Sequence, residues 1–518
     1  MPAFPVRTYQ ATIAQLGAPL EIPAALPKGA VPGRGGLEVT LRARLGDGLD
    51  GVREFLSAYR YVCLEQNLSR AVGLRDLKLW DTWVDNLPTY MDRDGLVRYF
   101  PNDQFDGDDT LTAYVLAIAN EAGWSLPESS RTRMIAGLTG FVEGRVVRYS
   151  ALPTADLAIR KLAAIAALSR YDAARPNMLD SLTIEPNLWP TSAVIDWLGI
   201  LRNVKGIKRR DERRAEAEGI LRTRLNFQGT TMTFSTERTD ALWWLMISPD
   251  SNSVRALLEL MDRPDWRDDV SRLVRGAIGR QQNGHWNTTV ANAWGTLAME
   301  KFSAAFESTP VTGTTVLRYG TKAENVDWTA KTTQRESSFA WQPGTLPLLA
   351  NHAGTGKPWM ITRATAALPL EAPLFTGYRI TRTVTPVEQR QTGKWTRGDV
   401  ARVRLEIDAQ SDMSWVVVED PVPGGATILG GALRGQSELM TRGERNEGWA
   451  WPAYEERRFE TYRAYYRFVP KGKWVVEYTV RLNNPGTFLL PATHVEAMYA
   501  PEMLGELPLQ PVIVEATP

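Results

Sequence analysis

The only cysteine of the chain is Cys63, and Gln66 follows it three positions later in Cys63-Leu64-Glu65-Gln66. One tight helical turn would bring this thiol and this carboxamide together. Attack of the sulfur on the Gln66 carbonyl would expel ammonia and leave an internal thioester. A thioester is an acyl donor that an amine or a hydroxyl can capture covalently, and here the protein would be consumed in one turnover. The spacing predicts a covalent trap with Cys63 as the thiol and Gln66 as the acyl group.

The neighbouring residues suggest how such a bond would be made and kept dry. Glu65 is a candidate base or orienting group for ring closure, unless it only caps the helix or faces solvent. Tyr59 lies four positions before Cys63, so on a continuous helix its ring would cover the same face and shield the bond from water. The simpler alternatives stay open, in which Cys63 is a small buried apolar residue and Tyr59 an ordinary core residue.

A second motif indicates a different chemistry. Asp106-Gly107-Asp108-Asp109-Thr110 matches the Asp-x-Asp-Asp-Thr pattern of squalene-hopene-type terpene cyclases, in which clustered carboxylates raise the pKa of an acid. An aspartate directly before an amphipathic helix is equally suited to an N-cap, and we favour that interpretation. The alternative functions are therefore a toroid cyclase that uses Asp106, Asp108 and Asp109, or a non-covalent binding module in which Cys63 is inert.

Composition narrows the remaining classes. The 60 basic and 59 acidic residues give a net charge of +1, so no strong field favours nucleic acid. A single cysteine excludes an intrachain disulfide framework. The three histidines, His285, His352 and His494, are scattered and form no ligand cluster, and His285 is expected to be a polar loop residue. We therefore expect neither a metal nor a cofactor.

Hydrophobic periodicity divides the 518 residues into regions, and the length indicates about three domains. Residues 1–50 alternate with period two, as in a strand over 36–45. Residues 51–306 have helical periodicity broken by Pro and Gly, which predicts helical hairpins that can close into an α/α toroid. Residues 307–372 return to strands and would share one β domain with 1–50, and 373–518 predict a β-sandwich. The fold class is thus multidomain α and β.

Several segments resemble one known family in the family's own order. Tyr59 to Arg70 is similar to the thioester region of bacterial alpha-2-macroglobulins, and Leu111 to Val115 to a helix of the toroid in their thioester domain. Asn484 to Phe488 and Glu496 to Glu502 resemble their last β domain. The resemblance implies a CUB-like domain in two halves (1–50 and 307–372), an inserted thioester domain (51–306) and a C-terminal macroglobulin-like, receptor-binding-like β-sandwich (373–518).

The resemblance also implies a function. The chain would be the C-terminal portion of a broad-range endopeptidase inhibitor, not an enzyme, whose thioester is attacked by lysine amines of target proteases. Met498 matches the position of a family methionine that helps a tyrosine, here Tyr59, to cover the bond. In the complement branch a histidine about a hundred residues after the motif directs transfer to hydroxyls, and its absence between Glu143 and Asp156 favours direct amine capture.

Members of the family are much longer, so the resemblance implies upstream macroglobulin domains, a bait region whose cleavage unmasks the thioester, and a lipoprotein signal, none of them in this chain. It implies a periplasmic protein of a Gram-negative bacterium that is anchored to the inner membrane. It further implies cooperation with a peptidoglycan glycosyltransferase in envelope defence, and no nucleic-acid partner.

Overall fold

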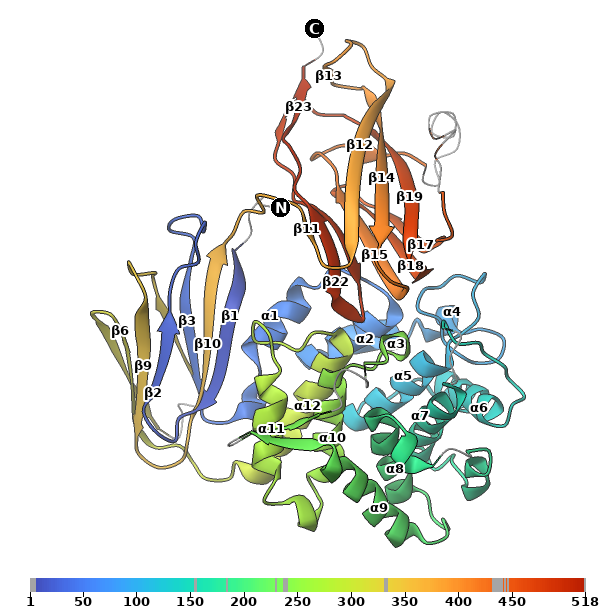
Figure 1. Ribbon diagram of the computed structural model, residues 1–518, viewed down its shortest axis with the longest axis vertical. Helices are drawn as coiled ribbons and strands as arrows, with labels where there is room; N and C mark the ends of the chain where they lie inside the picture. The colour runs from blue at the N-terminus through green and yellow to red at the C-terminus, as the bar shows by residue number, and fades with distance from the viewer. Residues whose placement is uncertain are drawn as a thin grey trace. The chain divides into compact units, whose positions relative to one another are not determined.

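A computed structural model describes residues 6–152, 156–182, 185–228, 231–235, 241–329, 334–430, 441, 444 and 447–516. The chain divides into two compact units, Val6–Ala367 and a second unit that contains the chain from Leu368 onward. The first unit holds a helical domain and a β domain, and the second is built from strands (Figure 1). No helix in the described ranges is long and apolar enough to cross a bilayer.

The helical domain is a closed ring. Its inner helices pack in the order α2, α5, α7, α8, α10 and α12, and α12 returns to pack on α2 (Figure 1). These inner helices are α2 (Leu64–Leu74), α5 (Asp109–Ala122), α7 (Leu157–Ser169), α8 (Thr191–Asn203), α10 (Pro249–Leu260) and α12 (Thr289–Phe306). Almost every residue of α8 and most of α12 are buried, as expected for helices that are covered on two sides. The ring is therefore the α/α toroid that the periodicity allowed.

Other helices connect and cover the inner ones. They are α1 (Asp50–Ala58), α3 (Leu77–Val84), α4 (Leu87–Tyr90), α6 (Glu128–Val142), α9 (Arg210–Thr223) and α11 (Val270–Gly279). Short 3-10 turns lie at Leu45–Asp47, Pro176–Leu179, Pro186–Leu188, Trp243–Leu245 and Pro264–Trp266. A two-stranded hairpin, β4 (Leu225–Gln228) and β5 (Thr231–Phe234), packs on α11 and was not expected within the helical region.

Two four-stranded sheets form the β domain of the first unit. One sheet has the order β1-β10-β3-β8 and the other β2-β9-β6-β7. The strands are β1 (Val6–Gln15), β2 (Leu20–Ala24), β3 (Gly35–Arg42), β6 (Gly313–Tyr319), β7 (Lys322–Trp328), β8 (Gln334–Phe339), β9 (Leu346–Ala353) and β10 (Trp359–Ala367). Strands from before the helical domain thus pair with strands from after it, and the toroid is an insertion in one β domain.

Both sheets contribute alternate residues to a common apolar core. Leu37, Val39 and Leu41 of β3 are at most 1% exposed, and they share this core with Leu317 of β6 and Phe339 of β8. In β3 the residues of this apolar core are every second one, as expected for a strand that turns one face to a core, while Thr40 and Arg42 on its other face are also buried. The period-two alternation seen in the sequence therefore has its physical cause in this two-sheet packing.

The second unit is a β-sandwich with a six-stranded sheet, β11-β22-β21-β15-β18-β17, and a four-stranded sheet, β12-β14-β19-β16. A smaller sheet has the order β13-β23-β20. The strands are β11 (Leu374–Phe375), β12 (Tyr378–Glu388), β13 (Trp395–Thr396), β14 (Val400–Ala409), β15 (Met413–Pro421), β16 (Thr427–Ile428), β17 (Pro452–Arg457), β18 (Thr461–Val469), β19 (Gly472–Arg481), β20 (Gly486–Phe488), β21 (Thr493–Ala497), β22 (Ala500–Leu507) and β23 (Val512–Glu515). The fold class expected from the sequence, a toroid inserted in a β domain and followed by a β-sandwich, is confirmed.

Candidate thioester site

The segment that carries Cys63 joins two helices. The first, α1, ends at Ala58, and Tyr59 follows it with an extended backbone (φ −67°, ψ 122°). Cys63 is also extended and is the N-cap of α2. The expectation that Tyr59 lies on one continuous helix with Cys63 is therefore wrong, because the chain between them has left the helical conformation. The backbone N–H of Leu64 donates to the Tyr99 carbonyl oxygen at 2.8 Å and fixes where α2 begins.

Cys63 and Gln66 form a reciprocal cap on the first turn of α2. The Cys63 side chain faces the backbone N–H of Gln66, and the Gln66 side chain turns back to the backbone of Cys63. The backbone N–H of Cys63 donates to Oε1 of Gln66 at 3.2 Å. Both side chains are fully buried. The helix start thus brings the thiol and the carboxamide to the same end of the same turn.

The carboxamide of Gln66 contacts a tyrosine that belongs to a group of aromatic rings. Its Nε2 donates to the Tyr59 hydroxyl oxygen at 3.2 Å. The Tyr59 ring lies 5.3 Å from the Phe55 ring and 5.3 Å from the Tyr61 ring, centroid to centroid. Tyr59 therefore reaches the carboxamide from outside the helix, and its contact does not depend on the helical spacing that first suggested it.

His285 belongs to this aromatic group, which sequence reasoning missed. Its imidazole stacks on Phe55 with ring centroids 4.0 Å apart and an interplanar angle of 12°. Burial lowers the pKa of His285, so the neutral form is favoured. His285 lies in the loop between α11 and α12, as the expectation of a polar loop residue has it, but this loop folds against α1, where Gly51 and Gly284 meet so closely that a Cβ on Gly51 would lie 2.4 Å from the Gly284 oxygen. Two glycines 233 positions apart were the only signal, and no local pattern links them.

Glu65 is buried inside the toroid and does not face solvent. Its Oε1 accepts hydrogen bonds from Ser69 at 2.6 Å and from Thr289, on α12, at 2.8 Å. Because the Ser69 hydroxyl donates to Glu65, the Tyr114 hydroxyl 2.5 Å away must donate to Ser69. Burial, reinforced by the Glu65 carboxylate, raises the pKa of Tyr114 well above its ordinary value, which keeps this donor protonated. Glu65 thus ties α2 to α12 directly, and Ser69 extends the network to Tyr114 on α5.

The aspartate motif is occupied by structural contacts. Oδ1 of Asp108 accepts from the Leu111 N–H at 2.9 Å and caps α5, as the N-cap interpretation predicts. Asp109 is buried and pairs with Arg160, whose Nε lies 3.0 Å from Oδ2. Asp106 is exposed. The motif residues therefore differ in environment, and the two best placed acids already have partners.

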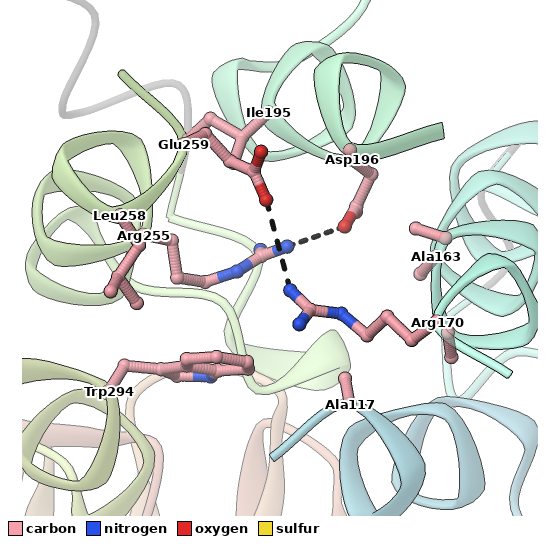
Figure 2. Close-up of a pocket in the computed structure, with 12 residues that line it drawn as sticks. Ala117, Ala163, Arg170, Ile195, Asp196, Arg255, Leu258, Glu259 and Trp294 are labelled. Atoms are coloured by element: carbon pink, nitrogen blue, oxygen red, sulfur yellow. Dashed lines mark hydrogen bonds and ion pairs between the residues drawn. The ribbon is translucent and has the colours of Figure 1, made fainter. Parts of the chain in front are cut away.

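The hollow at the centre of the ring is small and charged. Figure 2 shows Asp196, Arg170 and Glu259 pointing into it beside Trp294, with Arg255 paired to Asp196 and Arg170 to Glu259. Its volume is about 30 Å³, roughly the space of a single water molecule. A cyclase must enclose a polyene in an apolar cavity of several hundred Å³. This hollow does not fit that alternative.

Met498 lies in the second compact unit, between β21 and β22, and is 3% exposed. Its backbone N–H donates to the Trp415 carbonyl oxygen at 2.9 Å. The role of Met498 as a shield stays a prediction, and so do the roles assigned to Cys63, Gln66, Glu65 and Tyr59.

Comparison with known proteins shows which proteins this chain is similar to. The profile described as "Bacterial Alpha-2-macroglobulin MG10 domain" matches residues 377–502. An alpha-2-macroglobulin homolog of Nostoc sp. (strain PCC 7120) is 25% identical over 297 residues, which cover 53% of this chain and 15% of that protein.

Solved structures match almost the whole chain. The crystal structure of native Escherichia coli alpha-2-macroglobulin, from domain MG7 to the C-terminus, has a TM-score of 0.73 at 18% identity and covers 99% of this chain and 83% of that one. Salmonella alpha-2-macroglobulin reacted with methylamine has a TM-score of 0.71 at 19% identity, with 99% and 34% covered. The full E. coli protein gives 0.72 at 17% identity, and this chain spans 33% of it.

These findings confirm the family resemblance. Residues 377–502 are a macroglobulin-like MG10 domain of the bacterial alpha-2-macroglobulin type, and the chain has the fold of the C-terminal region of these proteins. The chain spans about a third or less of the longer proteins that it matches.

Proposed function

We propose that this chain carries the covalent trap of a protease-inhibiting bacterial alpha-2-macroglobulin, an internal thioester between Cys63 and Gln66. The observation that carries the proposal is the reciprocal cap, in which the buried Gln66 carboxamide turns back onto the buried Cys63 and meets the Tyr59 hydroxyl. Cysteine is not among the residues that usually cap helices, so the cap gains little stability from this choice. Thiol chemistry is a better reason for a cysteine at this position.

The chemistry proceeds in two stages. Sγ of Cys63 adds to the Gln66 carbonyl carbon, the C–N bond breaks, and ammonia leaves with the thiol proton. An amine later adds to the same carbon, the C–S bond breaks, and the sulfur departs as a thiol that takes a proton from the amine. The product is an amide between Gln66 and the captured amine. The backbone N–H of Cys63 points at Oε1 of Gln66, where negative charge develops in both stages, and can stabilise it.

Intact mass spectrometry tests the bond directly. We expect the freshly folded chain to be lighter than its sequence by one ammonia, and Cys63→Ala to have the full mass. Methylamine, with which the related Salmonella protein has been crystallised, should release one titratable thiol per chain and add one methylamine at Gln66. A full mass together with a thiol that titrates after unfolding, without methylamine, would overturn the proposal.

The nature of the captured group is a separate question. We propose lysine amines, because an unprotonated amine attacks a thioester without a relay. Nα-acetyl-lysine amide and Nα-acetyl-serine amide offer an amine and a hydroxyl of similar size. Peptide mapping should find the lysine adduct at Gln66 in large excess. Equal capture of both compounds would contradict amine selectivity and leave the thioester itself supported.

At the level of a whole protein, we propose a broad-range endopeptidase inhibitor that is single-turnover and has no catalytic activity of its own. The bait region, further macroglobulin domains and a lipoprotein anchor would lie upstream, the location would be the periplasm, and a peptidoglycan glycosyltransferase would act beside it. Fractionation of the native host with an antibody against this chain tests the location. Recovery in the cytoplasmic fraction would refute it.

A further inference from the structure

The Tyr59 hydroxyl contacts the atom of Gln66 that would leave. Nε2 of Gln66 lies 3.2 Å from the Tyr59 oxygen, while Oε1 accepts from the Cys63 backbone. A backbone N–H can only donate, so it must face the oxygen of the carboxamide. This hydrogen bond fixes the orientation of the Gln66 carboxamide, so that its nitrogen faces Tyr59.

The position of this nitrogen has a chemical meaning beyond the resting side chain. A glutamine is what results when ammonia captures the thioester. Gln66 in its free form therefore represents the adduct of the smallest amine, and Nε2 marks the place of an attacking nitrogen. Because formation and capture pass through the same type of tetrahedral intermediate, ammonia leaves, and an amine arrives, on the Tyr59 side.

The ring of Tyr59 is held in place by its neighbours. Phe55 and Tyr61 both lie 5.3 Å from it, at interplanar angles of 59° and 85°, and His285 stacks on the far side of this group against Phe55. Packing from several sides restricts the rotamers of Tyr59. A hydroxyl that is fixed in advance needs little reorganisation during reaction.

The hydroxyl of Tyr114, a buried tyrosine near the site, is committed elsewhere. Tyr114 has Cys63 and Glu65 as electrostatic neighbours, but its hydroxyl donates to Ser69. The Glu65 carboxylate accepts hydrogen bonds from the hydroxyls of Ser69 and Thr289. Among the hydrogen bonds described for these residues, Tyr59 makes the one to the carboxamide nitrogen.

We propose that the Tyr59 hydroxyl is a proton-transfer group of the thioester site, in addition to any shielding by its ring. During formation it gives its proton to the departing nitrogen, and the proton that the thiol loses restores the hydroxyl. During capture it accepts a proton from the attacking amine and returns one to the sulfur as the C–S bond breaks. The tyrosine is unchanged after each exchange, and no external acid or base is consumed. This inference rests on the proposed thioester.

Tyr59→Phe separates the hydroxyl from the ring. A shield needs only the ring, so a purely shielding role predicts a variant that behaves like the wild type. Loss of a proton-transfer group typically costs a hundredfold or more in rate. We expect thiol release by methylamine to slow by about a hundredfold in Tyr59→Phe, measured as a single-turnover rate on the 518-residue chain. Tyr61→Phe removes a hydroxyl from the same aromatic group and should react at the wild-type rate.

Formation of the bond gives an independent readout. If Tyr59→Phe retains the full mass, peptide mapping of residue 66 shows why. A carboxamide at 66 in a folded chain means that the thioester never formed and supports the proposal. A carboxyl at 66 means that the bond formed and then leaked to water, which overturns it. Thermal unfolding of the two phenylalanine variants, compared with wild type, checks that both are folded.

The outcomes distinguish this inference from the function on which it rests. If the wild type has the full mass and does not react with methylamine, the thioester proposal itself fails. If the wild type reacts and Tyr59→Phe reacts as fast, the thioester stands and the role of the hydroxyl is refuted. Tyr59→Leu, which removes the ring as well, should show the hydrolysis that loss of a shield causes.

Discussion

The first turns of two inner toroid helices, α2 and α5, begin with motifs that each suggested chemistry. At α2 the cap is Cys63 with Gln66, and at α5 it is Asp108 with the N–H of Leu111. Both motifs lie at helix N-termini, where backbone N–H groups need acceptors. The difference is what the side chains contact. In α2 the two side chains turn to each other's backbone, whereas in α5 the acids are used by a backbone N–H and by Arg160.

This comparison teaches that side chains at a helix N-terminus can either lie ready for a reaction or be used up in hydrogen bonds and ion pairs. The groups that each side chain contacts decide between these two roles. A strong cap such as aspartate contributes stability and leaves its carboxylate occupied. A weak cap such as cysteine gives up stability and keeps a nucleophile beside an electrophile. Variants at the two helix starts should therefore affect different properties.

The largest effect is expected at α2 and concerns chemistry alone. Cys63→Ser replaces the thiol with a hydroxyl, and serine caps helices well. The free energy of unfolding should therefore change by no more than about 1 kcal/mol. Methylamine capture should vanish, because an alkoxide equivalent is far harder to generate and to expel than a thiolate. Intact mass measures the capture of methylamine, and denaturant unfolding measures the change in stability. Capture at a wild-type rate would place the electrophile elsewhere.

The matching change at α5 should affect stability and leave capture intact. Asp109→Asn removes the nearer counterion of the buried Arg160 and leaves it with Asp156 at 3.6 Å, and breaking one side of a buried pair costs about 3–5 kcal/mol. Burial raises the pKa of Asp109 while Arg160 opposes this, so we expect a net cost at the low end of that range. Denaturant unfolding gives the cost, and the folded fraction should still be lighter by one ammonia. A stable variant without capture would revive a chemical role for the motif.

His494 and its two glutamate partners in the second unit offer a comparison that involves neither helix start. Burial lowers the pKa of His494, but hydrogen bonds to Glu496 and Glu506 outweigh this and raise it to about 9. The charged form is therefore favoured by folding. Its stabilisation is complete below the unfolded pKa of about 6.5 and is lost as pH rises from there through 9, by up to about 3 kcal/mol. Unfolding of the β-sandwich across this window should lose its slope in His494→Gln.

The smallest effect is expected for the cap of α5. Asp108→Ala removes the acceptor of the Leu111 N–H and should cost about 1 kcal/mol, while Asp108→Ser should restore most of it. Neither variant should change the rate of methylamine capture. A loss of capture in Asp108→Ala with normal stability would mean that the two helix starts are coupled chemically.

Local patterns predicted much of the secondary structure. The region with helical periodicity, 51–306, contains helices such as α8, and the region that returns to strands, 307–372, contains strands such as β6. Helix α6 was missed because its two glycines, Gly137 and Gly140, are poor helix formers. Tertiary packing explains the first of them, since a Cβ on Gly137 would lie 2.5 Å from the Asp94 oxygen. The first compact unit ends at Ala367, slightly before the boundary expected at 372.

The residues of the candidate site also fall into those that the sequence indicated and those that only the folded structure revealed. The spacing of Cys63 and Gln66 was sufficient to suggest the thioester, because three residues of chain span one helical turn. The helical reason given for Tyr59 was wrong, and the contact arises from an extended connection that only the folded chain defines. His285 joined the site through a loop more than two hundred residues away, which no local signal could indicate.

The sequence by itself indicated most of the elements and the candidate pair of Cys63 and Gln66, since both depend on neighbours within a turn of helix or a stretch of strand. The tertiary structure decided that the helices close into a ring, with α12 against α2, because closure depends on contacts between helices far apart in the chain. It also decided that the acids of the α5 motif have partners and that the Gln66 nitrogen faces Tyr59. Hydrogen bonds act over a few ångströms in space, and only the fold brings distant residues within that range.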